Sequence, residues 1–157
     1  MRVTIMTDAS VCPTGAAGYG FWIVSARGGT PGGGAFKSHI KDGYEGEFKA
    51  VVNALSYGVT NNLIQANDDV LIQLDNKGVV DILKGKLKPR EDLGVAYSML
   101  KKILSTNKIK LKARHVKGHT KVNDQRSKAN RMCDMRARLA MKEARRANTH
   151  SQSEETT

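Results

Sequence analysis

The sequence predicts a mixed α/β domain whose sheet presents carboxylates where its strands end. The first observation is an apolar run, Ile5–Ser10, which stops at Asp8 and a small polar residue. The second is a similar run, Val70–Asn76, which stops at Asp75. The third is a change to helical period after Tyr44. Two such strands side by side would bring Asp8 and Asp75 together, although an Asp that closes a strand more often serves as a turn or cap residue.

Length and composition indicate one domain. The chain has 157 residues, and we expect a folded domain over residues 1–147 and a disordered polar tail over 148–157. No apolar run approaches the roughly 20 residues of a membrane span, and the N-terminus lacks a signal-peptide layout. Cys12 and Cys133 are too few for a disulfide framework and lack zinc-ligand spacing. These features predict a cytoplasmic protein without membrane contact, and we expect a monomer.

The positive charge is concentrated in the last third of the chain. The net charge is +11, and residues 108–146 carry 14 Lys and Arg against three acids, which is the whole surplus. A basic face of this kind usually binds a polyanion, because neutralising phosphates releases condensed counterions. The alternative is a solvated surface that only keeps the protein soluble.

The first third of the chain has strand patterns separated by turn residues. Residues 2–7 and Tyr19–Ser25 predict two strands, joined by a loop that contains Pro13. The segment Arg27–Gly34 holds five glycines and predicts a flexible turn, and Ala35–Ile40 predicts a third strand. The three strands predict an antiparallel meander.

The middle of the chain alternates helices and strands. Four residues at helical spacing predict the first helix, namely Phe48, Val51, Val52 and Leu55. Glu47 lies at its first turn, where it either interacts favourably with the helix dipole or belongs to a functional site. A strand, a helix, a basic connector, a second helix and a strand follow, over Asp68–Asp75, Lys77–Leu83, Lys84–Arg90, Leu93–Leu104 and Lys108–Val116.

A long basic helix closes the pattern. After a loop at residues 117–120, the helix is expected over about Gln125–Ala147. Met132, Met135 and Leu139 are predicted to form its buried side. Asp134 lies beside that stripe among arginines, so it either pairs with an Arg or faces a metal ion.

The acids of these elements suggest a metal site. Four carboxylates in one place repel each other unless divalent cations neutralise them. Ligands that are all oxygen select a hard ion such as Mg²⁺, with Mn²⁺ as a substitute.

The order and spacing of these motifs resemble ribonuclease H type 1 from Arg2 to about Ala140. The resemblance rests on Thr7-Asp8-Ala9-Ser10 with Gly18-Tyr19-Gly20, on the acidic helix from Glu47, on Leu74-Asp75-Asn76, on Val116–His119 and on Asn130–Ala137. It implies a ribonuclease H-like α/β fold, with a five-stranded mixed sheet whose second strand is antiparallel, flanked by helices and without a long basic protrusion.

The resemblance also implies an activity and a site. Asp8, Glu47, Asp75 and Asp134 would hold two Mg²⁺ ions, and His119 would assist proton transfer or product release. The enzyme would be an endonuclease that hydrolyses the RNA strand of RNA–DNA hybrids to 5′-phosphate and 3′-hydroxyl ends. The residues expected to contact the hybrid are Ser10, Cys12, Gly46, Asn76, Lys84, Lys86, Lys88, Lys117, Asn130 and Arg138.

Two departures from the family pattern leave rival functions open. Members often carry two asparagines before the catalytic Glu, where this chain has Tyr44-Glu45-Gly46, so Gly46 is left to offer a backbone amide. Only the Lys84–Arg90 connector stands where many members have a basic protrusion, so the substrate grip is expected on the last helix. The rivals are a DNA nuclease of resolvase or transposase type and a catalytically silent nucleic-acid-binding protein.

Overall fold

The structure is a computed structural model that describes the backbone of residues 1–117 and 125–155 and the side chains of residues 1–117 and 131–147. Five strands form one sheet in the order β3-β2-β1-β4-β5. They are β1 (Arg2–Val11), β2 (Ala17–Ser25), β3 (Gly28–Ala35), β4 (Asp69–Leu74) and β5 (Lys110–His115). Strand β2 runs antiparallel to β1 and β3, whereas β4 runs parallel to β1 and β5. The predicted five-stranded mixed sheet with an antiparallel second strand is confirmed.

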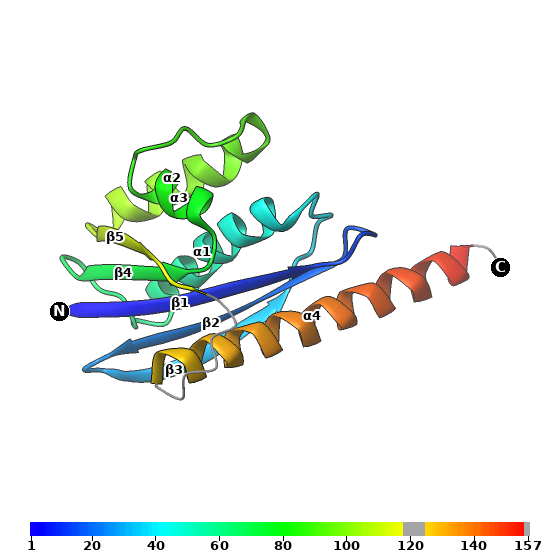
Figure 1. Cartoon of the computed structure of the whole chain (residues 1–157), viewed down its shortest axis with the longest axis horizontal. Coiled ribbons are helices and arrows are strands. Elements are labelled where there is room, and N and C mark those ends of the chain that lie inside the picture. The colour runs from blue at the N-terminus through cyan, green and yellow to red at the C-terminus, as the bar shows by residue number, and fades with distance from the viewer. Residues whose placement is uncertain (118–124, 156–157) are drawn as a thin grey trace.

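Helices cover both faces of the sheet (Figure 1). The helices α1 (Gly43–Thr60), α2 (Lys77–Leu83) and α3 (Gly94–Thr106) lie on one face, and a short 3-10 turn, η1 (Glu91–Leu93), precedes α3. The long helix α4 (Gln125–Glu155) lies on the other face, along β1, β2 and β3. No helix in the described ranges is both long enough and apolar enough to cross a bilayer.

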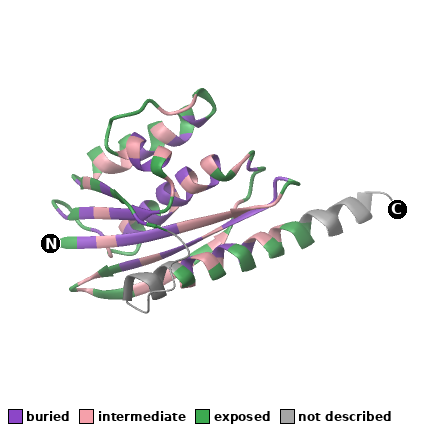
Figure 2. Ribbon diagram, viewed as in Figure 1, coloured by how far each residue is buried: buried purple, intermediate pink, exposed green. Residues whose placement is uncertain are grey.

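The main core fills the space between the sheet and α1 to α3. Every second residue of β1 and β4 points into it, as Val3, Ile5, Val70 and Ile72 do, because side chains alternate between the two faces of a strand. The apolar stripe predicted for α1 is confirmed, since Phe48, Val51, Val52 and Leu55 are all buried. Figure 2 shows this buried layer between exposed outer surfaces.

The third strand is not where the sequence pattern placed it. The segment predicted as a turn, Arg27–Gly34, forms most of β3, and the predicted strand Ala35–Ile40 lies almost wholly outside it. Because β3 is an edge strand bonded only to β2, it accommodates glycine and Pro31. The glycines also make room for the aromatic rings of β2. A Cβ atom at Gly32 would lie 2.3 Å from the ring of Phe21.

Helix α4 packs through small residues, which corrects the predicted methionine stripe. Met135 and Leu139 are 55% and 54% exposed, and the buried residues among the described side chains of α4 are Cys133, Ala137 and Ala140. The cause lies on β2, where Gly18 and Gly20 leave no side chain between sheet and helix. A Cβ atom at Gly20 would lie 2.3 Å from the carbonyl oxygen of Cys133, and one at Gly18 would lie 2.4 Å from the amide nitrogen of Met141. Only small helix residues fit so close an approach.

Helix α4 also exceeds its predicted length. It ends at Glu155 instead of about Ala147, so its backbone includes most of the segment expected to be a disordered tail. Beyond the sheet, the helix continues toward the C-terminus without a strand beneath it (Figure 1).

Candidate active site

Asp8 and Asp75 lie beside each other where β4 stops and β1 continues. The parallel register pairs Met6 with Gln73, so two further residues on each strand lead to Asp8 and Asp75. Strand β1 extends past Asp8 to Val11, because β2 still pairs with it there. Asp75 follows directly on β4. The predicted juxtaposition of these two acids therefore follows from the sheet register.

Glu47 reaches this point from helix α1. The helix starts at Gly43, so Glu47 lies in its second turn and not in its first turn as predicted. The acid of the first turn is Glu45. Asp42 Oδ1 accepts a hydrogen bond from the amide of Glu45 at 3.0 Å, and Glu45 Oε1 accepts one from the amide of Lys41 at 2.6 Å. Glu47 Oε1 instead accepts from the amide of Ala9 at 3.2 Å, so this side chain faces β1.

The two carboxyl groups of Asp8 and Glu47 share a confined space. Glu47 Oε2 is buried and has no hydrogen-bond partner among the described residues. Burial, followed by the charge of Asp8, raises the pKa of Glu47 to about 9. Burial likewise raises the pKa of Asp8 to about 6, against the lowering effect of its hydrogen bond with Glu47. At neutral pH without metal, the pair therefore holds a proton.

Asp134 joins the pair from α4. Its charge and a side-chain hydrogen bond further raise the pKa of Asp8, so the two groups are in direct reach of each other. Its other partner is Arg138, whose Nε lies 3.1 Å from Asp134 Oδ2 one helical turn away. The residue before it, Cys133, is buried against β1, with its Sγ 3.6 Å from the carbonyl oxygen of Met6. The glycine contact of α4 with β2 thus sets how close Asp134 comes to Asp8.

Asp75 is the outer member of the four acids. It is 45% exposed, and its Oδ1 lies 3.4 Å from His115 Nε2, at the end of the neighbouring strand β5. Its charge contributes to the raised pKa of Glu47. Sequence reasoning missed His115, although the parallel pair of Leu74 with His115 places it at the same edge of the sheet.

The carboxylate oxygens of the four acids suit a hard divalent cation. In this structure their negative charge is balanced instead by the proton on the Asp8 and Glu47 pair and by contacts with His115 and Arg138. Four carboxylates gather at one edge of the sheet, and one buried carboxylate oxygen, Glu47 Oε2, has no partner. Within the part of the chain that the structure describes, however, no three Asp, Glu, His or Cys side chains converge tightly enough to hold an ion. Asp8, Glu47, Asp75 and Asp134 are the residues that would hold such a cation, and its charge would favour the ionised form of the Asp8 and Glu47 pair.

The stability of the metal-free protein should fall as pH rises. Glu47 has a folded pKa of about 9, above the ordinary value of 4.5, so its contribution is complete below pH 4.5 and is lost as pH rises through about 9. Asp8 acts in the same direction between 3.8 and about 6. Each proton changes the free energy of unfolding by at most about 1.4 kcal/mol per pH unit.

Melting temperatures measured in chelator from pH 5 to pH 9 test this dependence. Glu47→Gln should remove most of the decline above pH 6, whereas Glu91→Gln, a change at an exposed acid, should leave it intact. An unchanged slope in Glu47→Gln would contradict the shared proton.

The residues predicted to contact substrate have different surroundings. Gly46 is buried against Val11, and its amide donates to the carbonyl of Asp42 at 3.1 Å, so it offers no amide to a substrate. Asn76 caps α2 by accepting from the amide of Val79 at 3.0 Å. The lysines at 84, 86, 88 and 117 are exposed, and Ser10 and Cys12 are half-buried beside the β1 edge. His119 and the side chain of Asn130 lie outside the described residues.

The basic connector is fixed to the start of α1, a feature that sequence reasoning did not find. Arg90 pairs with Asp42, the cap of that helix, through contacts of 2.7 and 3.1 Å. It also pairs with Asp92 at 2.8 Å, and its guanidinium lies 4.8 Å from the ring centroid of Tyr44. Arg90 is thus neutralised, whereas Lys84, Lys86 and Lys88 project as exposed cations from the same connector.

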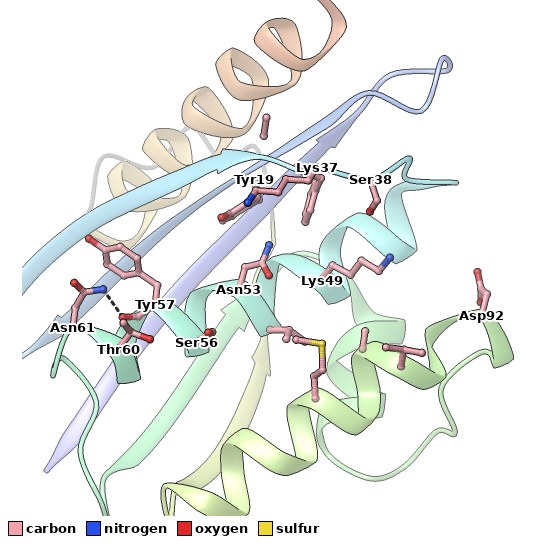
Figure 3. Close-up of a pocket in the computed structure, with 16 residues that line it drawn as sticks. Tyr19, Lys37, Ser38, Lys49, Asn53, Ser56, Tyr57, Thr60, Asn61 and Asp92 are labelled. Carbon is pink, nitrogen blue, oxygen red and sulfur yellow. Dashed lines mark hydrogen bonds between the residues drawn. The ribbon is translucent and has the colours of Figure 1, made fainter. Parts of the chain in front are cut away.

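A hollow of about 720 Å³ lies elsewhere, between the end of β3, α1 and α3 (Figure 3). Tyr19, Lys37, Lys49, Asn53 and Tyr57 are among the side chains that line it. None of the four clustered acids lines this hollow, so the candidate site rests on the carboxylates and not on this cavity.

The sheet order, the helix arrangement and the placement of the acids define a ribonuclease H-like fold, and comparisons with solved structures agree. The N-terminal RNase H domain of a Mycobacterium tuberculosis protein, solved as a fusion with maltose-binding protein, matches with a TM-score of 0.72 at 20% identity, over 94% of this chain and 98% of that one. RNase H1 of the halophilic archaeon Halobacterium salinarum matches with a TM-score of 0.70 at 20% identity, over 91% and 99%. LC11-RNase H1 in complex with RNA/DNA hybrid matches with a TM-score of 0.72 at 18% identity, over 90% and 98%.

This chain therefore has the fold of ribonuclease H type 1, as its motifs predicted. No protein-family model matches the sequence, and a search of curated proteins finds no match.

Proposed function

We propose that this protein is a metal-dependent endonuclease that cleaves the RNA strand of RNA–DNA hybrids, leaving 5′-phosphate and 3′-hydroxyl ends. The observation that carries the proposal is that Asp8 interacts with both Glu47 and Asp134, which come from separate helices, and lies next to Asp75 in the sheet register of a ribonuclease H-like fold. Burial of like charges costs stability, and a bound divalent cation would offset that cost. One of the structural neighbours is an RNase H1 in complex with an RNA/DNA hybrid, which supports this choice of substrate.

The four acids would hold two Mg²⁺ ions, which would supply Lewis acidity for attack by water on phosphorus and for departure of the 3′ oxygen. Asp8 and Glu47 hold a proton at neutral pH, and a bound cation would take over its role of offsetting their negative charge. Arg138 shields Asp134 on the outer side of the site. His119, in the segment before α4, is proposed to assist proton transfer or product release.

Cleavage assays on three substrates test the proposal. The protein with Mg²⁺ should cut the RNA strand of an RNA–DNA hybrid and leave duplex DNA and duplex RNA intact, and Mn²⁺ should replace Mg²⁺. End analysis of the fragments should give 5′-phosphates. Cutting of duplex DNA would favour the resolvase or transposase rival, and metal-independent binding of hybrid without any cleavage would favour the silent binder.

A further inference from the structure

Four basic residues of α4 lie on the same face as Asp134. Arg131, Arg138, Lys142 and Arg145 are placed three or four residues apart around Asp134, and this spacing puts them on one face of a helix. All four cations are exposed, and Arg138 contacts Asp134 directly at 3.1 Å. We call these four residues the α4 basic face.

This face leads away from the carboxylates in a straight line. The eleven residue steps from Asp134 to Arg145 span about 16 Å of helix at about 1.5 Å per residue. Near its far end, Arg145 interacts with Cys12 in the loop after β1; hydrogen bonds from Thr14, and secondarily Arg145, lower the pKa of that thiol. The cations therefore follow the surface from the site to the β1–β2 turn.

We propose, on the basis of the function proposed above, that the α4 basic face carries one flank of the nucleic-acid substrate away from the site. A nucleic acid presents a phosphate about every 3.4 Å along each strand, so about 16 Å of basic surface spans several phosphates. A row of cations that begins at an acid of the site matches a polyanion whose backbone passes over that acid. The α4 basic face thus offers the substrate a set of cations separate from the Lys84–Arg90 connector.

The arrangement differs from a helix that binds a lipid surface. Such a helix lies in the interface with a continuous apolar side facing the lipid. The small-residue side of α4 is instead packed on the sheet. Among the described residues of α4, the exposed large apolar side chains are those of Met135 and Leu139, beside the basic face. Charge in line with the site, and not apolar area, is the dominant property of this surface.

Charge reversal at the far end of the face tests the proposal without touching the acids. Lys142→Glu with Arg145→Glu should raise KM for hybrid at least tenfold at moderate salt, with kcat nearly unchanged, and reduce the slope of log affinity against log salt by about one per lost phosphate contact. The matched control is Lys110→Glu with Lys112→Glu, an equal charge change at exposed positions of β5. The control should keep KM and the salt slope close to wild type.

Substrate trimming makes the test independent of small changes in folding. Shortening the hybrid on the flank held by α4 should weaken wild-type binding but not further weaken the Lys142 and Arg145 double variant, because the contact is already lost. Shortening the other flank should weaken both proteins equally.

Several results would overturn the inference. A double variant with wild-type KM and salt slope would do so while leaving the proposed function intact, and so would equal losses in the β5 control. If the wild-type protein cleaved no hybrid, the proposed function would fail, and hybrid binding in chelator would still decide whether α4 grips it. Loss of binding to phosphatidylserine vesicles with unchanged hybrid affinity would assign the face to lipid instead.

Discussion

Asp75→Asn should reduce Mg²⁺-dependent cleavage of hybrid by roughly three or more orders of magnitude. The amide keeps the shape of the side chain but removes a negative charge that the cations require. The fold should persist, because Asp75 is half exposed and its one described ion-pair partner is His115. Single-turnover cleavage at saturating hybrid measures the loss, and the melting temperature in chelator measures the fold.

Two other acids of the same strand region give the comparison. Asp69, exposed at the start of β4, should tolerate the change to Asn with unaltered cleavage and stability. Asp68 is buried and pairs with Arg27 at 2.6 Å, which lowers its pKa to about 2, so its replacement should cost stability first. Normal cleavage by Asp75→Asn would remove the strand-end acid from the mechanism and with it the site proposed here.

Gly20→Ala should destabilise the protein by roughly 2 kcal/mol or more and also impair cleavage. The added Cβ atom would lie 2.3 Å from the carbonyl oxygen of Cys133, and such overpacking typically costs about 1 to 3 kcal/mol. Moving α4 outward also moves Asp134 away from Asp8, the cross-strand partner of Gly20. Urea unfolding and cleavage assays well below the melting temperature measure the two effects separately.

A glycine in open space provides the control. A Cβ atom at Gly94, at the start of α3, would meet nothing within 4 Å, so Gly94→Ala should be neutral or slightly stabilising with full activity. Wild-type stability and Mg²⁺ dependence in Gly20→Ala would show that α4 does not depend on this close approach.

The sequence predicted most of the fold because its strongest periodic signals lie in elements that pack on the main core. The stripe of α1 and the exact span of α2 were predictable, since their apolar residues face a side-chain-rich sheet. Strand β3 was not predictable, because its glycines make room for the aromatic rings of β2 and do not favour a strand by themselves. The buried side of α4 was mispredicted because large apolar residues indicate a buried side only where the partner surface leaves room for them.

The acids of the candidate site were predictable from the order of the motifs and from the strand ends. Their protonation and pairing were not predictable. Nothing in the spacing indicates that Asp8 and Glu47 hold a proton or that Asp75 pairs with His115, because these depend on burial and on a neighbouring strand. The helical hydrogen bond of the Gly46 amide was also not predictable, because a glycine before Glu47 looks the same in sequence whether its amide is free or bonded within a helix.

The anchoring of Arg90 divides the connector into two parts with different freedom to evolve. Asp42 both caps the helix that carries Glu47 and binds Arg90, so residues 42 and 90 are expected to change together. The stretch from Lys84 to Lys88 is exposed and lies before that anchor, with Gly85 at a φ of 76°. Insertions there would lengthen the connector without moving α1.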